Sequence, residues 1–78
     1  MSWNYRVVVD GTFYGIHEVY YDTKGDIIAC TENPVVIGSS SQSLNELEKE
    51  YVMMGEALSK PPILYTDIGE KDDTTGDN

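Results

Sequence analysis

The sequence predicts an α+β fold in which a three-stranded antiparallel meander packs against one long helix. Three observations support this prediction. Apolar and polar side chains alternate between Trp3 and Glu32 with the period of two that half-buried strands show. Turn-forming residues divide that stretch into three strands. A capped amphipathic pattern follows, with the period of a helix that packs on one face.

The three strands are expected over Trp3–Val9, Thr12–Tyr21 and Asp26–Glu32. Asp10-Gly11, between the first two, is a dipeptide favoured in two-residue hairpin loops. Asp22–Gly25, between the second and third, has the pattern of a type I turn that ends on a left-handed glycine. These two turns make the strands consecutive and antiparallel.

The helix is expected to begin at Ser43 and to end after Lys60. Ser43-Leu44-Asn45-Glu46 fits a capping box, in which the Ser hydroxyl and the Glu carboxylate each accept a hydrogen bond from an orphan backbone N–H. Two consecutive prolines after Lys60 cannot continue a helix. Gly55 weakens the interior by about 1 kcal/mol relative to Ala, and we interpret it as a point of close packing against the sheet. The stripe expected to face the sheet consists of Leu44, Leu47, Tyr51, Met54 and Leu58.

Both faces of the predicted sheet are apolar, although only one helix is available to cover them. An Asp10-Gly11 loop places Val7 opposite Tyr14, and a bulge turn at Gly25 places Glu18 opposite Cys30. One face then carries Trp3, Tyr5, Val7, Tyr14, Ile16, Tyr20 and Ile28. The opposite face carries Val8, Phe13, Val19, Tyr21 and Ile27.

The second apolar face needs a cover, because large apolar patches are rarely left in water. The segment Ile63–Ile68, which can add a short C-terminal strand, is one candidate, and a second copy or a partner protein are the others. We therefore predict a protein interface on this face, formed by Phe13, Val19, Tyr21 and Ile27.

Acidic residues dominate the charge of the chain. Its 78 residues carry 14 acids and 5 bases, for a formal net charge of -9. Residues 1–68 are expected to form a single α+β domain. Residues 69–78 hold no large apolar side chain and are expected to form an acidic disordered tail. Arg6 and Lys24 are the only bases on the predicted strands and turns, which argues against nucleic-acid binding despite the many tyrosines.

No pattern in the sequence indicates catalysis. His17 and Cys30 are the only histidine and the only cysteine, and the predicted register places them on opposite faces. Glu18 and Glu32 are expected on one face as solvated carboxylates. We therefore predict no catalytic residue, no metal site, no cofactor and no enzymatic activity. The sequence contains neither a secretory apolar region nor a membrane-spanning run, so we expect a cytoplasmic protein that does not bind membranes.

The order of the elements resembles the HicB-like antitoxin superfamily. The resemblance rests on three meandering strands followed by the helix pattern of residues 43–58, and it covers about residues 3–66. The segment Gly15–Asp22 also resembles small uncharacterised bacterial proteins of this shape. The resemblance implies a partial ribonuclease-H-like fold and a non-catalytic, protein-binding domain that often self-associates.

Two functions remain open at this stage. The first is a small cytoplasmic protein-interaction module, antitoxin-like or adaptor-like, that binds an unidentified protein partner and can form a homodimer. The alternative is an acidic inhibitory protein, phage-encoded or DNA-mimicking, that acts on a nucleic-acid-binding target. The net charge of -9 motivates the alternative.

Overall fold

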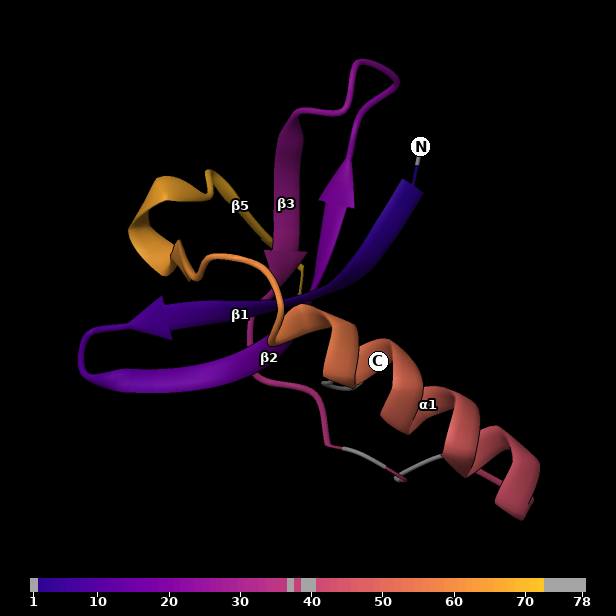
Figure 1. Ribbon diagram of the computed structural model, residues 1–78. Coiled ribbons are helices and arrows are strands. Elements are labelled where there is room, and N and C mark those ends of the chain that lie inside the picture. Colours follow the sequence, from indigo (N-terminus) through magenta and orange to yellow (C-terminus); the bar gives the residue numbers. More distant parts are fainter. Residues whose placement is uncertain (1, 37, 39–40, 73–78) are drawn as a thin grey trace.

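A computed structural model describes residues 2–36, 38 and 41–72, and shows a curled five-stranded mixed sheet with one helix (Figure 1). Its elements are β1 (Ser2–Asp10), β2 (Phe13–Tyr21), β3 (Ile27–Thr31), α1 (Leu44–Ala57), β4 (Ile63–Leu64), the 3-10 turn η1 (Tyr65–Asp67) and β5 (Glu70–Asp72). The strand order is β4-β1-β2-β3-β5. The α+β class is confirmed, and the antiparallel meander forms the centre of the sheet. The two edge strands pair in parallel, β4 with β1 and β5 with β3.

The first hairpin closes one residue later than predicted. Asp10 pairs with Phe13, so the loop is Gly11-Thr12, and Val7 lies opposite Ile16 instead of Tyr14. Gly11 has a φ of 63°, which suits the glycine that opens a type II′ turn. The error displaces the pairing by two residues. Because side chains alternate with a period of two, every side chain of these strands keeps its predicted face.

The second hairpin contains a bulge between Tyr20 and Tyr21, whereas the sequence predicted a bulge at Gly25. The turn itself is as predicted: Asp22 Oδ1 accepts hydrogen bonds from the backbone N–H groups of Lys24 (2.9 Å) and Asp26 (3.0 Å). The register shifts between Tyr20 and Tyr21, however, so Cys30 lies opposite Val19 and not opposite Glu18. A shift of one residue exchanges the faces of β3 beyond the bulge, from Ala29 to Thr31, whereas Ile27 stays opposite Tyr21 and keeps its predicted face.

The exchange of faces corrects two predictions. His17 and Cys30 lie on the same face of the sheet, not on opposite faces, since both share the alternation of Val19. Glu18 and Glu32 lie on opposite faces. Glu18 accepts a hydrogen bond from the Tyr20 hydroxyl (2.8 Å), whereas Glu32 borders the same cavity as His17.

The start of α1 is confirmed and its end is not. The Ser43 Oγ accepts from the Glu46 N–H (3.2 Å), while the Glu46 carboxylate accepts from the N–H of Gln42 (2.9 Å), one residue before the cap. The helix ends at Ala57, because the N–H groups of Leu58, Ser59 and Lys60 donate to carbonyls three residues earlier, in a tighter final turn. The Ser59 hydroxyl also donates to the Glu56 carbonyl (2.7 Å).

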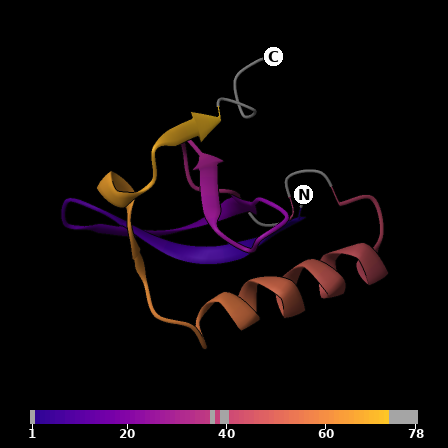
Figure 2. The same ribbon diagram turned by 90° about the horizontal axis from the view of Figure 1, so that it is seen from above.

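The predicted helix stripe is mostly uncovered. Met54 is the only member of the stripe that is buried, and the second buried residue of α1 is Ala57. The helix packs on β1 near one edge of the sheet and does not lie across all the strands (Figure 2). A narrow contact of this kind leaves the stripe residues Leu44, Tyr51 and Leu58 exposed.

Two small cores lie on the two faces of the sheet. On the helix side, Tyr5 and Val7 pack with Met54 and Ala57. On the other side, Val8, Val19 and Cys30, one from each central strand, pack with Ile68. Figure 2 shows α1 along one face and the segment from β4 to β5 curling over the other.

The segment from β4 to β5 forms a strap that spans the second face. β4 lies at the edge next to β1 and β5 at the edge next to β3, so residues 64–70 must cross the strands between them. The Arg6 guanidinium donates to the Pro61 carbonyl (2.8 Å) just before the strap begins. Of the three covers considered for this face, the segment Ile63–Ile68 is therefore the one found, and its short strand is confirmed.

The strap also changes the boundary of the predicted tail. Residues 70–72 form β5, in which Glu70 pairs with Ala29 and Asp72 with Thr31, so a disordered tail beginning at residue 69 is wrong for this part. The remainder of the predicted tail, residues 73–78, lies outside the described residues.

Replacing Ile68 by Ala should destabilise the fold by about 2–4 kcal/mol, because the side chain is 2% exposed and its loss leaves a cavity above three strands. Urea unfolding followed by circular dichroism measures this change. Leu64→Ala, in the same strap but 52% exposed, is the control and should shift stability by less than about 1 kcal/mol. Equal losses in the two variants would contradict the role of Ile68.

Replacing Gly15 by Ala should destabilise the fold by about 1–3 kcal/mol. A Cβ at this position would lie 2.9 Å from Pro34 Cγ, and the proline ring cannot rotate away. Thermal unfolding gives the measurement. Gly69→Ala is the matched control, since a Cβ there meets nothing within 4 Å, and an equal loss in both variants would show that the clash is relieved without cost.

Candidate functional site

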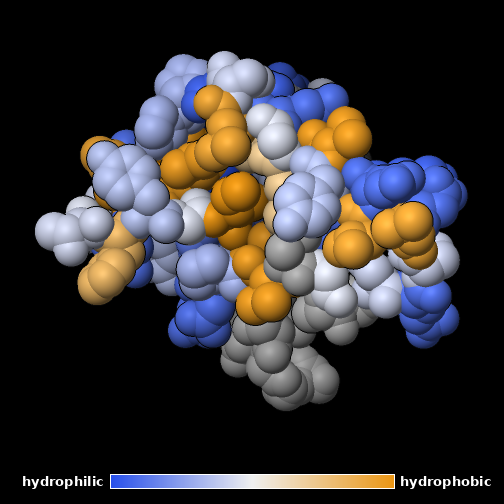
Figure 3. Space-filling view, turned by 60° about the horizontal axis from the view of Figure 1, so that its bottom comes forward, coloured by the Kyte–Doolittle hydropathy of each residue, from blue (hydrophilic) through white to orange (hydrophobic). Residues whose placement is uncertain are grey.

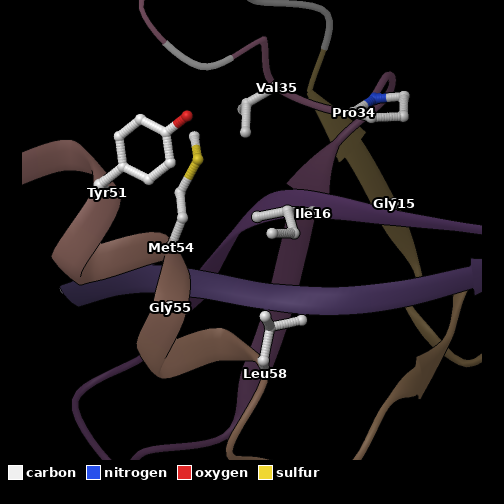
Figure 4. A pocket seen from close by; sticks show the side chains of 8 residues that line it. All are labelled: Gly15, Ile16, Pro34, Val35, Tyr51, Met54, Gly55 and Leu58. Atoms are coloured by element: carbon white, nitrogen blue, oxygen red, sulfur yellow. The ribbon is translucent and has the colours of Figure 1, made fainter. Parts of the chain in front are cut away.

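An apolar groove runs beside α1 on the helix side of the sheet, with a volume of about 450 Å³ (Figure 4). One wall is helical and presents Tyr51, Met54, Gly55 and Leu58, which recur at helical spacing. The other wall is formed by β2 and the segment that follows β3, with Gly15, Ile16, Pro34 and Val35. In Figure 4 the Met54 and Ile16 side chains extend toward the space between the two walls.

Backbone contacts hold the second wall in place. The Val35 N–H donates to the Ile16 carbonyl (2.8 Å), which extends the pairing of β2 beyond the end of β3. Gly15 accommodates the Pro34 ring at a distance that no side chain would permit. This wall therefore depends on a glycine and a proline nineteen positions apart in the chain.

Gly55 keeps the helical wall open. A Cβ at Gly55 would meet no atom within 4 Å, so the prediction that this glycine allows close packing against the sheet is wrong. The helix instead stands away from β2 at this point, and the missing side chain adds to the space of the groove.

The groove is bordered by large apolar side chains that remain in contact with solvent. Leu58 is 72% exposed, and Tyr51 is also exposed. The face in Figure 3 shows apolar side chains gathered in patches among hydrophilic ones. Exposed apolar surface at a concave site is typical of places where proteins bind other molecules.

The helix that borders the groove is acidic. α1 contains four carboxylates, those of Glu46, Glu48, Glu50 and Glu56, against the single amine of Lys49. Glu50 accepts hydrogen bonds from the Gly38 N–H (2.9 Å) and the Ser41 hydroxyl (3.0 Å). Burial raises the pKa of the nearby Tyr5 phenol, and the Glu18 and Glu50 carboxylates raise it further. The negative potential on this side favours cationic groups in whatever binds here.

The four residues predicted as an interface do not form one surface. Val19 is completely buried beneath the strap, so its assignment to a free interface is wrong. Tyr21 is half-buried, and its hydroxyl donates to Asn4 Oδ1 (2.7 Å). Phe13 and Ile27 are exposed, but they stand at opposite ends of β2 and β3, Phe13 beside the first hairpin loop and Ile27 beside the second. Their role in binding stays a prediction.

Sequence reasoning identified the helical wall of the groove but interpreted it as core. The stripe that includes Tyr51 and Leu58 was visible in the pattern. The opposite wall was missed, since neither composition nor periodicity shows that Pro34 packs on Gly15.

The described residues do not present the chemistry of a nucleophilic or metal site. Burial raises the pKa of the Cys30 thiol, with Lys71 acting in the opposite direction, so the reactive thiolate is disfavoured. Between residues 2 and 72, with the gaps noted above, no group of three His, Cys, Asp or Glu side chains is placed to hold a metal ion. None of the described helices is both long and apolar enough to cross a membrane.

No protein-family model, curated protein or solved structure matches this chain, so the resemblance to HicB-like domains stays a prediction.

Replacing Gly55 by Ala should stabilise the fold by about 0.5–1 kcal/mol. Alanine loses less backbone entropy in a helix, and the added Cβ meets no neighbour. Chemical denaturation at constant pH measures the change. A loss of stability would mean that the helix approaches the sheet more closely than the groove geometry allows.

Proposed function

We propose that this chain is a small protein-interaction module, antitoxin-like or adaptor-like, whose groove receives apolar side chains from a basic segment of a partner protein. The observation that carries the proposal is the groove itself, a concave apolar site on a helix whose stripe is largely uncovered. Partner binding would remove Leu58 and Tyr51 from water, which the folded chain alone does not do.

Charge complementarity supports a basic partner. The helix beside the groove carries four acids and one base, and the whole chain has a net charge of -9. Like charge would oppose an acidic segment, whereas Lys and Arg flanking the apolar anchors would gain affinity and faster association. The proposed relationship to HicB-like domains is consistent with a non-catalytic binding role.

The second candidate function, an acidic inhibitor of a nucleic-acid-binding protein, is favoured by one observation. β5 places Glu70 on a regular sheet edge next to β3, so part of the C-terminal acidity lies on an ordered surface. Mimicry of nucleic acid depends on ordered negative charge more than on apolar anchors.

Replacing Leu58 by Ser should lower the affinity for partner peptides by about tenfold, because an apolar side chain of the peptide loses its contact with Leu58 in the groove. The probes are peptides selected by display on the wild-type protein, with counter-selection on a groove-filling Gly55→Leu variant. Affinities are measured by calorimetry at fixed salt. Selected peptides should combine apolar anchors with Lys or Arg, and should shift the NMR methyl signals of Ile16, Val35 and Met54.

The matched control is Val52→Ser. Val52 is 63% exposed on the same helix but borders a different hollow, with Asn45, Lys49 and Met53 among its neighbours. Equal weakening by the two variants would contradict groove binding. Peptides that bind the Leu58→Ser variant as tightly as the wild type, but lose affinity steeply as the salt concentration rises, would favour the acidic inhibitor instead.

The same variants test self-association. Sedimentation velocity at about 100 μM, a concentration that reveals dimers of micromolar affinity, distinguishes a monomer from a homodimer. A dimer that Leu58→Ser disrupts would identify a second copy as the occupant of the groove.

A further inference from the structure

A second cavity, of about 360 Å³, lies at the first hairpin on the strap side of the sheet. Asp10, Phe13 and Tyr14 border it from the hairpin, and His17 and Glu32 border it from β2 and the end of β3. Gly15 and Pro34 separate this cavity from the apolar groove, since both residues border both spaces. The two sites therefore lie on opposite faces of one thin wall.

The His17 ring is buried and held in one tautomer. The residue is 3% exposed, and its Nδ1 lies 2.9 Å from the Thr31 carbonyl oxygen. A carbonyl oxygen can only accept, so Nδ1 carries the hydrogen, and in the neutral ring Nε2 is left as an acceptor.

The acceptor nitrogen of His17 faces the cavity without a partner. Nε2 makes no hydrogen bond within the described part of the chain, and it lies 3.5 Å from where a Cβ on the cavity residue Gly15 would stand. Because this nitrogen is an acceptor on the cavity side of an otherwise buried ring, it is available to a hydrogen-bond donor that enters the cavity.

Two carboxylates add acceptors to the same cavity. Asp10 and Glu32 both border it, and neither forms an ion pair with a described residue. Partial burial raises the pKa of the adjacent Tyr65 phenol, and the acidic groups Cys30, Glu32 and Asp10 raise it further. The amine of Lys71 is engaged with the strap: it stands over the Tyr65 ring, 4.3 Å from the centroid, and donates to the Ile68 carbonyl.

Aromatic rings complete the site. Phe13 and Tyr14 border the cavity, and both are largely exposed at the tip of the hairpin. Exposed rings at a protein tip commonly stack on planar or cationic groups. Phe13 lies on the strap face, whereas Tyr14 alternates to the helix face, so Phe13 is the ring placed for stacking beside the acceptors.

The arrangement distinguishes an organic cation from a metal ion. Nε2 and the two carboxylates do not converge closely enough to form a metal site within the described residues. A guanidinium suits acceptors that are spread apart, since it is planar, presents five N–H donors in a rigid fork and stacks on aromatic faces.

We propose that this cavity binds the guanidinium of an arginine side chain from a partner polypeptide, with His17 Nε2, Asp10 and Glu32 as acceptors and the Phe13 ring as a stacking surface. The site does not require the apolar groove to be occupied. Arginine binding in this cavity would give the strap face a binding function that is separate from that of the groove.

NMR of the His17 ring tests the proposal directly. His17 is the only histidine in the chain, so both imidazole ¹⁵N signals belong to it, and their couplings to the ring C–H protons distinguish Nδ1 from Nε2. Titration with N-acetyl-arginine methylamide should shift the Nε2 signal saturably while Nδ1 stays protonated. The neutral isostere N-acetyl-citrulline methylamide should produce no saturable shift, and the lysine analogue should bind more weakly.

Variants show whether the carboxylates act specifically. Glu32→Gln and Asp10→Asn should each lower the affinity for capped arginine by about tenfold, as expected for loss of a charge-assisted hydrogen bond. Glu48→Gln removes the same charge from the exposed side of α1 and should leave the affinity unchanged. Amide spectra that match the wild type establish that each variant is folded.

Several results would overturn the proposal. Citrulline binding as tightly as arginine would show that the positive charge is not recognised. An equal loss of arginine affinity in Glu48→Gln would show that the carboxylates act only through the net charge of the protein. Saturable binding of free arginine without binding of the capped form would exclude a polypeptide source. A shift of Nε2 by micromolar Zn²⁺, with none by capped arginine, would identify a metal site instead.

Discussion

The packing of Ile68 on Val8, Val19 and Cys30 is the contact on which the rest of this structure depends. A small chain with one helix cannot cover both faces of an apolar sheet by that helix alone. The strap solves this problem with few residues, because it enters at the β4 edge, crosses the strands and leaves at the β5 edge. Both parallel edge pairings are consequences of that crossing.

Because the strap covers one face of the sheet, α1 has to bury only part of the other face. The helix has to cover only the region over β1, and it does so with two small contacts at Met54 and Ala57. Its remaining apolar side chains border a groove whose other wall is held by the Val35–Ile16 backbone bond. The groove is therefore part of the folded architecture, and its exposed apolar surface is available to a partner without rearrangement of the core.

The bulge between Tyr20 and Tyr21 decides which side chains meet on the strap face. It moves Cys30 to the side of Val19, where the thiol is covered by Ile68 and serves as a small core residue. It also places the carbonyl of Thr31 against His17 and brings Glu32 to the same cavity. The proposed arginine site thus depends on a single irregularity in the pairing of two strands.

The sequence by itself determined the local elements of this protein. Alternation predicted the three central strands, Asp22 and Gly25 predicted the second turn, and Ser43 with Glu46 predicted the start of the helix, since these signals act over a few residues. Tertiary structure alone decided the faces of β3, the burial of Val19 and the exposure of the helix stripe. A bulge, a strap and the contact of Pro34 with Gly15 join residues far apart in the chain, and their geometry follows from packing and not from any local pattern.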